Sequence, residues 1–205
     1  MEQNQQPKWE AKFTKRLTKA KAEQIWPLFT DFFNLNRWFP SIPTCYGIHG
    51  TNGELGCIRY CGGFSIPSDP TEQHQNDSNL PVVSWSKEKL IAIEHAERCL
   101  SYEIIDSNIG YKSYVAVVKI VPAKEEEGGG CVIEWSFTVN PVEGCVFDDI
   151  VSTWDMAIQI VADRMEDEAK KVSEQQPLSH ENSKPVGDGK AMVEPKVPTP
   201  DPIIF

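Results

Sequence analysis

The feature that most constrains the fold of this chain is a long amphipathic helix near the end of its regular part. Apolar residues in the segment 145–172 recur at i, i+3, i+4 and i+7, the repeat that places them on one helical face. The stripe consists of Phe147, Ile150, Val151, Trp154, Ile158, Val161 and Met165. A stripe of this length must be buried against another element, so the rest of the domain has to supply a covering surface.

The segments before this helix alternate in the way that predicts β-strands. A helix over 22–35, in which Pro27 suggests a kink or a break, and a short helix or turn over 37–42 follow the first strand. The predicted strands are 9–17, 45–49, 55–65, 82–94, 99–106, 111–122 and 131–141. This order predicts an α+β fold in which a curved antiparallel sheet wraps the C-terminal helix and leaves an internal cavity.

Three stretches lack the pattern of a packed element. Residues 1–8 are polar and are expected to be a flexible N-terminus, and 67–81 form a long polar loop between two strands. Residues 173–205 are rich in Pro, Ser, Glu and Lys without periodicity, which predicts a disordered tail. The folded domain is therefore expected to span 9–172.

Composition excludes several classes of partner. The chain has 205 residues and a net charge of −10, and this acidic balance repels nucleic acid. No apolar run approaches the roughly 18 residues of a membrane-spanning helix. The N-terminus lacks the apolar core of a signal peptide, so we expect a cytoplasmic protein. The six cysteines include no CxxC pair, and we expect reduced thiols.

Strand alternation also predicts which side chains point toward the helix. The predicted inward faces of two strands hold Cys57, Arg59 and Cys61, and Ser84, Ser86, Glu88, Leu90 and Ala92. The opposite face of the second strand carries Lys87 and Lys89, which is typical of a solvent side. Arg59 and Glu88 are therefore predicted to lie inside the domain.

Two interpretations of this inward pair are open on these grounds. Arg59 and Glu88 could serve only to neutralise each other, because a buried charge is costly unless it is paired. Alternatively, an apolar pocket raises the pKa of Glu88 and suits it to act as an acid or base, while Arg59 holds a ligand oxygen.

The aromatic residues leave a similar choice. Tyr102 and Tyr114 fit either a pocket wall or the core, and the same holds for Trp135 and Trp154. No histidine lies at the spacing of a hydrolytic triad or a metal site, and the chain has neither a phosphate loop nor a dinucleotide fingerprint. We therefore predict no metal and no cofactor.

Four motifs, "GCIRY", "SKEKL", "GYKSY" and "EWSF", resemble the plant lachrymatory factor synthase family over roughly residues 9–172. That family belongs to the helix-grip proteins, also called Bet v 1-like or START-like, with the polyketide cyclases and abscisic acid receptors. The resemblance implies an isomerase or lyase that converts a 1-alkenyl sulfenic acid to a thial S-oxide without a cofactor. It implies an arginine at Arg59, a glutamate at Glu88, and pocket aromatics at Tyr102, Tyr114 and Trp135.

Two departures from related proteins matter. Ser84 stands where related synthases carry an aromatic residue, which implies a wider pocket floor. The receptor branch is an alternative, but this chain lacks its Ser-Gly-Leu-Pro-Ala gate, its His-Arg-Leu latch and a lysine in the segment 37–41. These absences argue against a hormone sensor.

The sequence therefore predicts a cofactor-free isomerase or lyase acting on a small hydrophobic or sulfur-containing metabolite. In this prediction Glu88 is the acid or base and Arg59 anchors the oxyanion. The predicted substrate-binding residues are Tyr102, Tyr114, Trp135, Trp154 and Ser84. The alternative is a non-catalytic binder or carrier of a small hydrophobic metabolite, which would use the same cavity.

Overall fold

The structure, a computed structural model, describes residues 7–64, 83–124, 126 and 128–175. Residues 1–6, most of the predicted N-terminal segment, and the whole predicted loop 67–81 lie outside the described residues. The described elements are β1 (Trp9–Leu17), α1 (Ala22–Thr30), the 3-10 helix η1 (Phe32–Arg37), β2 (Thr44–His49), β3 (Ile58–Phe64), β4 (Ser84–Glu94), β5 (Cys99–Ser107), β6 (Val115–Pro122), β7 (Cys131–Val139) and α2 (Phe147–Gln175).

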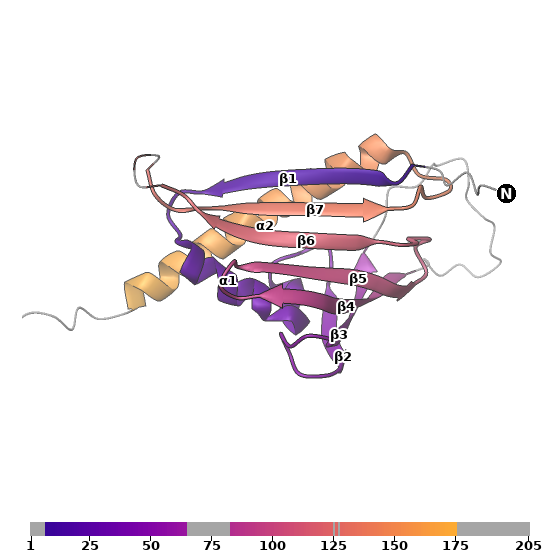
Figure 1. Ribbon diagram of the computed structural model, residues 1–205, viewed down its shortest axis with the longest axis horizontal. Helices are drawn as coiled ribbons and strands as arrows, with labels where there is room; N and C mark the ends of the chain where they lie inside the picture. The colour runs from indigo at the N-terminus through magenta and orange to yellow at the C-terminus, as the bar shows by residue number, and fades with distance from the viewer. Residues whose placement is uncertain (1–6, 65–82, 125, 127, 176–205) are drawn as a thin grey trace, which may run out of the picture. The chain divides into compact units, whose positions relative to one another are not determined.

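The strands form one antiparallel sheet in the order β1-β7-β6-β5-β4-β3-β2. The long helix α2 crosses one face of this sheet and α1 lies on the same side (Figure 1). Six of the strands follow one another as a meander, and β1 closes the far edge by pairing with β7. This arrangement confirms the predicted α+β helix-grip fold, in which a sheet covers the apolar stripe of the C-terminal helix.

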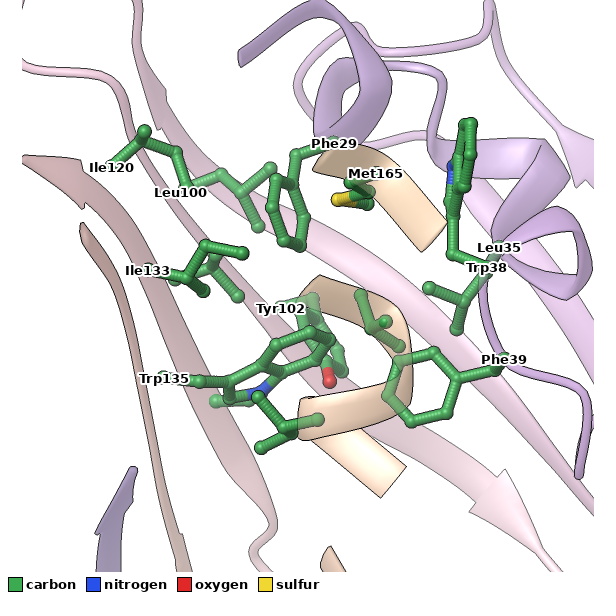
Figure 2. Packing of buried hydrophobic residues seen from close by; sticks show 14 of the residues in the cluster. Phe29, Leu35, Trp38, Phe39, Leu100, Tyr102, Ile120, Ile133, Trp135 and Met165 are labelled. Carbon is green, nitrogen blue, oxygen red and sulfur yellow. The ribbon is translucent and has the colours of Figure 1, made fainter. Parts of the chain in front are cut away.

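The core lies between the sheet and the helices and is rich in aromatic side chains. Residues of β7 alternate strictly between buried and half-buried, so Trp135 points inward from the centre of the strand. Its ring contacts Phe29 of α1, Phe39 after η1, and Trp154 of α2, with centroids 5.7, 5.5 and 6.1 Å away. Figure 2 shows Trp135 and Tyr102 reaching toward Phe29 and Phe39. Trp135 of the sheet therefore contacts α1, the segment after η1, and α2.

The helix does not break at Pro27, whereas a kink there stays a prediction. The helix α1 continues through Pro27 and ends at Thr30, and a 3-10 helix follows directly. Proline leaves the carbonyl of Glu23 without its usual helical donor, but both residues lie on the exposed face, where water can replace that bond. The helix therefore tolerates Pro27 at this position.

Alternation in β4 holds only as far as Leu90. Ser86, Glu88 and Leu90 are buried as predicted, whereas Ala92 is exposed. The pairing register with β5 shifts between Leu90 and Ala92, and such a bulge rotates the following side chains to other faces. The predicted inward face of this strand is therefore shorter than the sequence suggests.

The C-terminal helix is longer than predicted, because α2 runs to Gln175. Ser173 explains part of this extension, since its hydroxyl donates to the carbonyl of Ala169 at 2.9 Å and accepts from the Gln24 amide at 2.8 Å. The first three residues of the predicted tail are thus helical. Residues 176–205, the rest of that tail, lie outside the described residues.

Candidate active site

A buried ion pair lies at the centre of the candidate site. Arg59 of β3 and Glu88 of β4 are directly opposite each other in the ladder between these strands. The Arg59 side chain donates from Nε and Nη2 to the same oxygen, Oε2 of Glu88, at 2.8 and 2.6 Å. Arg59 is 3% exposed and Glu88 is 7% exposed. The structure therefore brings together the two residues that the sequence singled out, and buries both.

The surroundings of Arg59 stabilise its charge. Its Nη1 donates to the backbone carbonyl of Phe32 at 2.9 Å, and its Cζ lies 3.9 Å from the centre of the Phe32 ring and 5.0 Å from that of Tyr102. Burial is the largest single influence and lowers the pKa of Arg59. Attraction to Glu88 and to other neighbouring groups outweighs it, so the net pKa is raised. Arg59 is a fixed cation.

The second carboxylate oxygen of Glu88 has a different environment. Oε1 accepts a hydrogen bond from the Ser86 hydroxyl at 3.0 Å. Ser86 and Glu88 both line a cavity between the sheet and α2, whereas Arg59 is not among its described lining residues. The carboxylate therefore has one oxygen held by Arg59, and Glu88 contributes to the cavity wall together with Ser86.

The cavity is small and mainly apolar. It has a volume of about 90 Å³. An apolar cavity of about 150 Å³ is known to hold benzene, so this space suits a ligand of only a few heavy atoms. Its lining comes from the segment after η1, the end of β3, β4, β5, the connection to β6, and α2: Phe39, Ser41, Ile42, Phe64, Ser86, Glu88, Ile104, Ile109, Tyr111, Tyr114, Ile150, Thr153, Trp154 and Ala157.

The predicted site residues divide between this cavity and a second space. Tyr114 and Trp154 line the cavity with Glu88. Arg59, Tyr102 and Trp135 instead line a void of about 10 Å³ on another side of the ion pair, large enough for about one water molecule. The side chain of Arg59 donates to Glu88 and to the carbonyl of Phe32, and its contact with a ligand oxygen stays a prediction.

Ser84 lies outside the described lining of this cavity, and its role in substrate binding stays a prediction. It is half-buried at the start of β4, opposite Phe64, and the described cavity lining includes Ser86 in its place. The register between β3 and β4 shifts between Gly62 and Phe64, so regular alternation does not extend to this end of the pair.

Tyr114 supplies an unusual polar group. Its side chain is buried, and its hydroxyl makes no hydrogen bond of good geometry within the described part of the chain, although the Tyr102 hydroxyl lies close enough to act as a weak partner. Burial raises the pKa of Tyr114, and the nearby Tyr102 and Glu88 raise it further, so the phenol stays protonated. A buried hydroxyl with only a weak partner is costly, and a ligand oxygen in the cavity could accept its hydrogen bond.

Several lining residues were not identified as site residues from the sequence. Tyr111 and Ile109 lie in the connection before β6, because that strand begins at Val115 and not at residue 111 as predicted. Burial raises the pKa of Tyr111 to about 12. Ile150 belongs to the helical stripe, so helical periodicity could have placed it here. Ser86 shares the inward face of Glu88 and was the one polar neighbour that alternation could have assigned.

Two further observations concern the described residues as a whole. Within them, no three side chains of His, Cys, Asp or Glu gather as a metal site would require. No helix in these ranges combines the length and the apolar character that crossing a membrane requires.

Comparison with solved structures supports the fold. The chain is similar to the protein XoxI from Bacillus cereus, with 17% identity, a TM-score of 0.54, and coverage of 82% of this chain and 99% of that one. It is also similar to ginseng major latex-like protein 151 from Panax ginseng, with 15% identity, a TM-score of 0.58, and coverage of 79% and 97%. At these identities the likeness concerns the Bet v 1-like fold alone.

Family membership follows from the sequence profile. The profile described as polyketide cyclase / dehydrase and lipid transport matches residues 10–172, from the first strand to the last turns of α2. The match covers well over half of the 205 residues and includes Glu88 and the cavity lining. The protein therefore belongs to the polyketide cyclase / dehydrase and lipid transport family.

Proposed function

We propose that this protein is a cofactor-free isomerase that moves a proton within a small ligand held against Glu88. The observation that carries this proposal is that the two oxygens of the Glu88 carboxylate have different partners. Oε2 accepts hydrogen bonds from Arg59, whereas Oε1 accepts one from Ser86, which lines the cavity. A carboxylate fixed in this way is oriented for proton transfer without having to reorganise.

The proposed substrate class is a 1-alkenyl sulfenic acid, as the resemblance to lachrymatory factor synthases implies. Glu88 takes the proton from the sulfenic acid oxygen and returns a proton to the second carbon of the alkenyl chain. The double bond moves as the thial S-oxide forms, and no electrons are lost or gained. The cavity of about 90 Å³ and its apolar lining fit a short alkenyl chain.

Oxygen charge that develops during this transfer needs a hydrogen-bond donor. The Tyr114 hydroxyl is the proposed donor, because Tyr114 lines the cavity and its hydroxyl makes no hydrogen bond of good geometry within the described residues. Arg59 acts as a positioning residue in this proposal, since it orients and balances Glu88 without being among the described residues that line the cavity.

The second candidate is a carrier that binds a small apolar metabolite without changing it. The observation in its favour is that Arg59 already neutralises Glu88, so a purely structural ion pair would satisfy the same contacts. A carrier and an isomerase differ in what Glu88→Gln does, because only the isomerase requires a group that gains and loses a proton.

The test is conversion of a 1-alkenyl sulfenic acid, generated in the assay, by the wild type and by Glu88→Gln. We expect the wild type to accelerate formation of the thial S-oxide. Glu88→Gln should lose roughly 10²–10⁴-fold in turnover, the usual contribution of such a group. Glu103→Gln on the outer face of β5 is the matched control and should keep full activity.

Other outcomes would decide against the proposal. A wild type that converts the sulfenic acid no faster than buffer does would exclude this substrate class. If the wild type and Glu88→Gln bind the same metabolite equally and neither changes it, the carrier function is supported instead.

A further inference from the structure

Two cysteines on the strands beside the ion pair lie in contact. Cys45 of β2 and Cys61 of β3 are directly opposite each other in the ladder between these strands. Their sulfur atoms are 3.5 Å apart, with the Cys61 thiol donating to the Cys45 sulfur. Cys45 is 9% exposed and Cys61 is 0% exposed. All six cysteines of the chain are free thiols and lie in described residues.

We propose that Cys45 and Cys61 form a redox-active dithiol, which a hydroperoxide converts to a disulfide that joins the edge strand β2 to β3. The geometry requires little rearrangement. A disulfide bond is about 2.05 Å long, so the two sulfurs need to approach each other by about 1.5 Å. Side chains directly opposite each other in an antiparallel ladder already have their β-carbons close together.

The two thiols differ in a way that assigns their roles. The hydrogen bond from Cys61 is the largest influence on the pKa of Cys45 and lowers it, while burial opposes this effect and Arg59 supports it. The same hydrogen bond and burial raise the pKa of Cys61. Cys45 is also the less buried of the two and lies on the edge strand, so the proposal assigns Cys45 as the attacking thiolate and Cys61 as the resolving thiol.

The reaction with hydrogen peroxide balances in two steps. The Cys45 thiolate attacks one peroxide oxygen, the O–O bond breaks, and the departing hydroxide takes up a proton as water, which leaves a sulfenic acid on Cys45. The Cys61 sulfur then attacks the Cys45 sulfur. The S–O bond breaks, and the oxygen leaves as water with the proton of Cys61. Two thiols are oxidised and one peroxide is reduced to two water molecules.

Cys45 and Cys61 lie at the edge of the sheet, although Cys99 and Cys145 are more exposed than either thiol of this pair. β2 is the last strand of the sheet, and its residues from Tyr46 to His49 are exposed. Elsewhere burial raises the pKa of Cys57 and Cys145, and raises that of Cys131 to about 11. Oxidation should therefore be selective for Cys45 and Cys61 over these thiols.

The test treats the full chain with a small excess of hydrogen peroxide and follows free thiols, intact mass and peptide mapping. We expect the number of free thiols to fall from six to four, with one linkage between Cys45 and Cys61 that dithiothreitol reverses. The linkage closes a loop of 16 residues, so the oxidised protein should melt several degrees higher than the reduced protein.

Variants separate the two roles. Cys61→Ser should stop at a sulfenic acid on Cys45 that dimedone labels, because a hydroxyl cannot form a disulfide. Cys45→Ser should lose the fast oxidation. Cys57→Ser is the matched control, because it removes a buried thiol from the same face of the chain and should leave the disulfide forming at the wild-type rate.

Three results would overturn the proposal. One is a folded wild type that retains all six thiols under conditions that oxidise the urea-unfolded chain. Another is peptide mapping that shows a different pair, and the third is Cys45→Ser oxidising as fast as the wild type. The wild-type experiment decides the matter even if a serine variant folds poorly.

Discussion

The carboxylate of Glu88 takes part both in a buried ion pair and in the wall of the cavity. Glu88 compensates the buried charge of Arg59, and the same side chain forms part of the cavity wall beside Ser86. The sequence predicted the pairing because both residues fall on inward faces of neighbouring strands. It could not predict which oxygen Arg59 would hold, nor that Arg59 lines a separate void, because both depend on side-chain rotamers and on the exact register.

Removal of Arg59 should destabilise the fold strongly. Arg59→Met leaves the Glu88 carboxylate buried without a counter-charge, and we expect the free energy of unfolding to fall by about 3–5 kcal/mol. Urea denaturation measures this change. The double variant Arg59→Met/Glu88→Leu should recover most of the loss because no buried charge remains. A single variant as stable as the wild type would show that the pair is not buried in solution.

Tyr114→Phe should separate stability from function. The hydroxyl makes no hydrogen bond of good geometry within the described residues, so its removal should leave the free energy of unfolding at pH 7 nearly unchanged. If this hydroxyl supports the ligand oxygen, turnover of the sulfenic acid should fall. Equal turnover in Tyr114→Phe and wild type would remove Tyr114 from the proposed mechanism.

The pH dependence of this variant gives a second measurement. Burial raises the pKa of Tyr114 in the folded protein, whereas the unfolded chain ionises near pH 10. Tyr114 is therefore neutral in both states below pH 10. Above pH 10 the unfolded chain ionises first, so the free energy of unfolding falls as the pH rises. Tyr114→Phe should make this alkaline loss shallower by about 1.4 kcal/mol per pH unit.

The elements of the fold were predictable where one periodicity persists along the chain. β7 alternates without interruption, and the α2 stripe repeats over many turns, so both were found with nearly correct bounds. The errors lie where local structure departs from the pattern. A bulge in the pairing with β5 exposes Ala92. The helix α1 continues through Pro27 to Thr30, because water can replace the hydrogen bond that proline removes on the exposed face.

The backbone just before β7 comes very close to the end of β1, and a substitution at this contact tests how tightly the two strands are joined. Gly130 has a positive φ of 83°, and a β-carbon there would lie 2.1 Å from the carbonyl oxygen of Leu17. We expect Gly130→Ala to lower the free energy of unfolding by more than about 1 kcal/mol, because strain and a backbone clash combine.

Gly128→Ala is the matched control for this prediction. Gly128 also has a positive φ, 88°, but a β-carbon there would meet nothing within 4 Å in the described part of the chain. Thermal denaturation of both variants separates the two effects, because Gly128→Ala has only the backbone strain of a positive φ and Gly130→Ala adds the clash with the Leu17 carbonyl. Equal destabilisation in the two variants would mean that the connection relaxes around the added methyl group of Gly130→Ala.

For the molecule as a whole, a sheet that covers one face of a long helix leaves a small space where polar and aromatic side chains meet. The sequence predicted this architecture, including the inward pair, and the family profile over 10–172 agrees with it. The size of the cavity could not be predicted. It depends on side chains from six different segments, among them Tyr111 and Ile109 in the connection before β6.

The central claim is that Glu88, fixed on one wall of the cavity, delivers the proton to one face of the ligand. Conversion of 1-propenyl sulfenic acid in heavy water tests it directly, because the second carbon of the product then carries one deuterium and becomes a stereocentre. With the product trapped at once, we predict a single configuration at that carbon with the wild type and equal amounts of both in buffer alone. Equal amounts of both configurations from the enzyme reaction would contradict the claim.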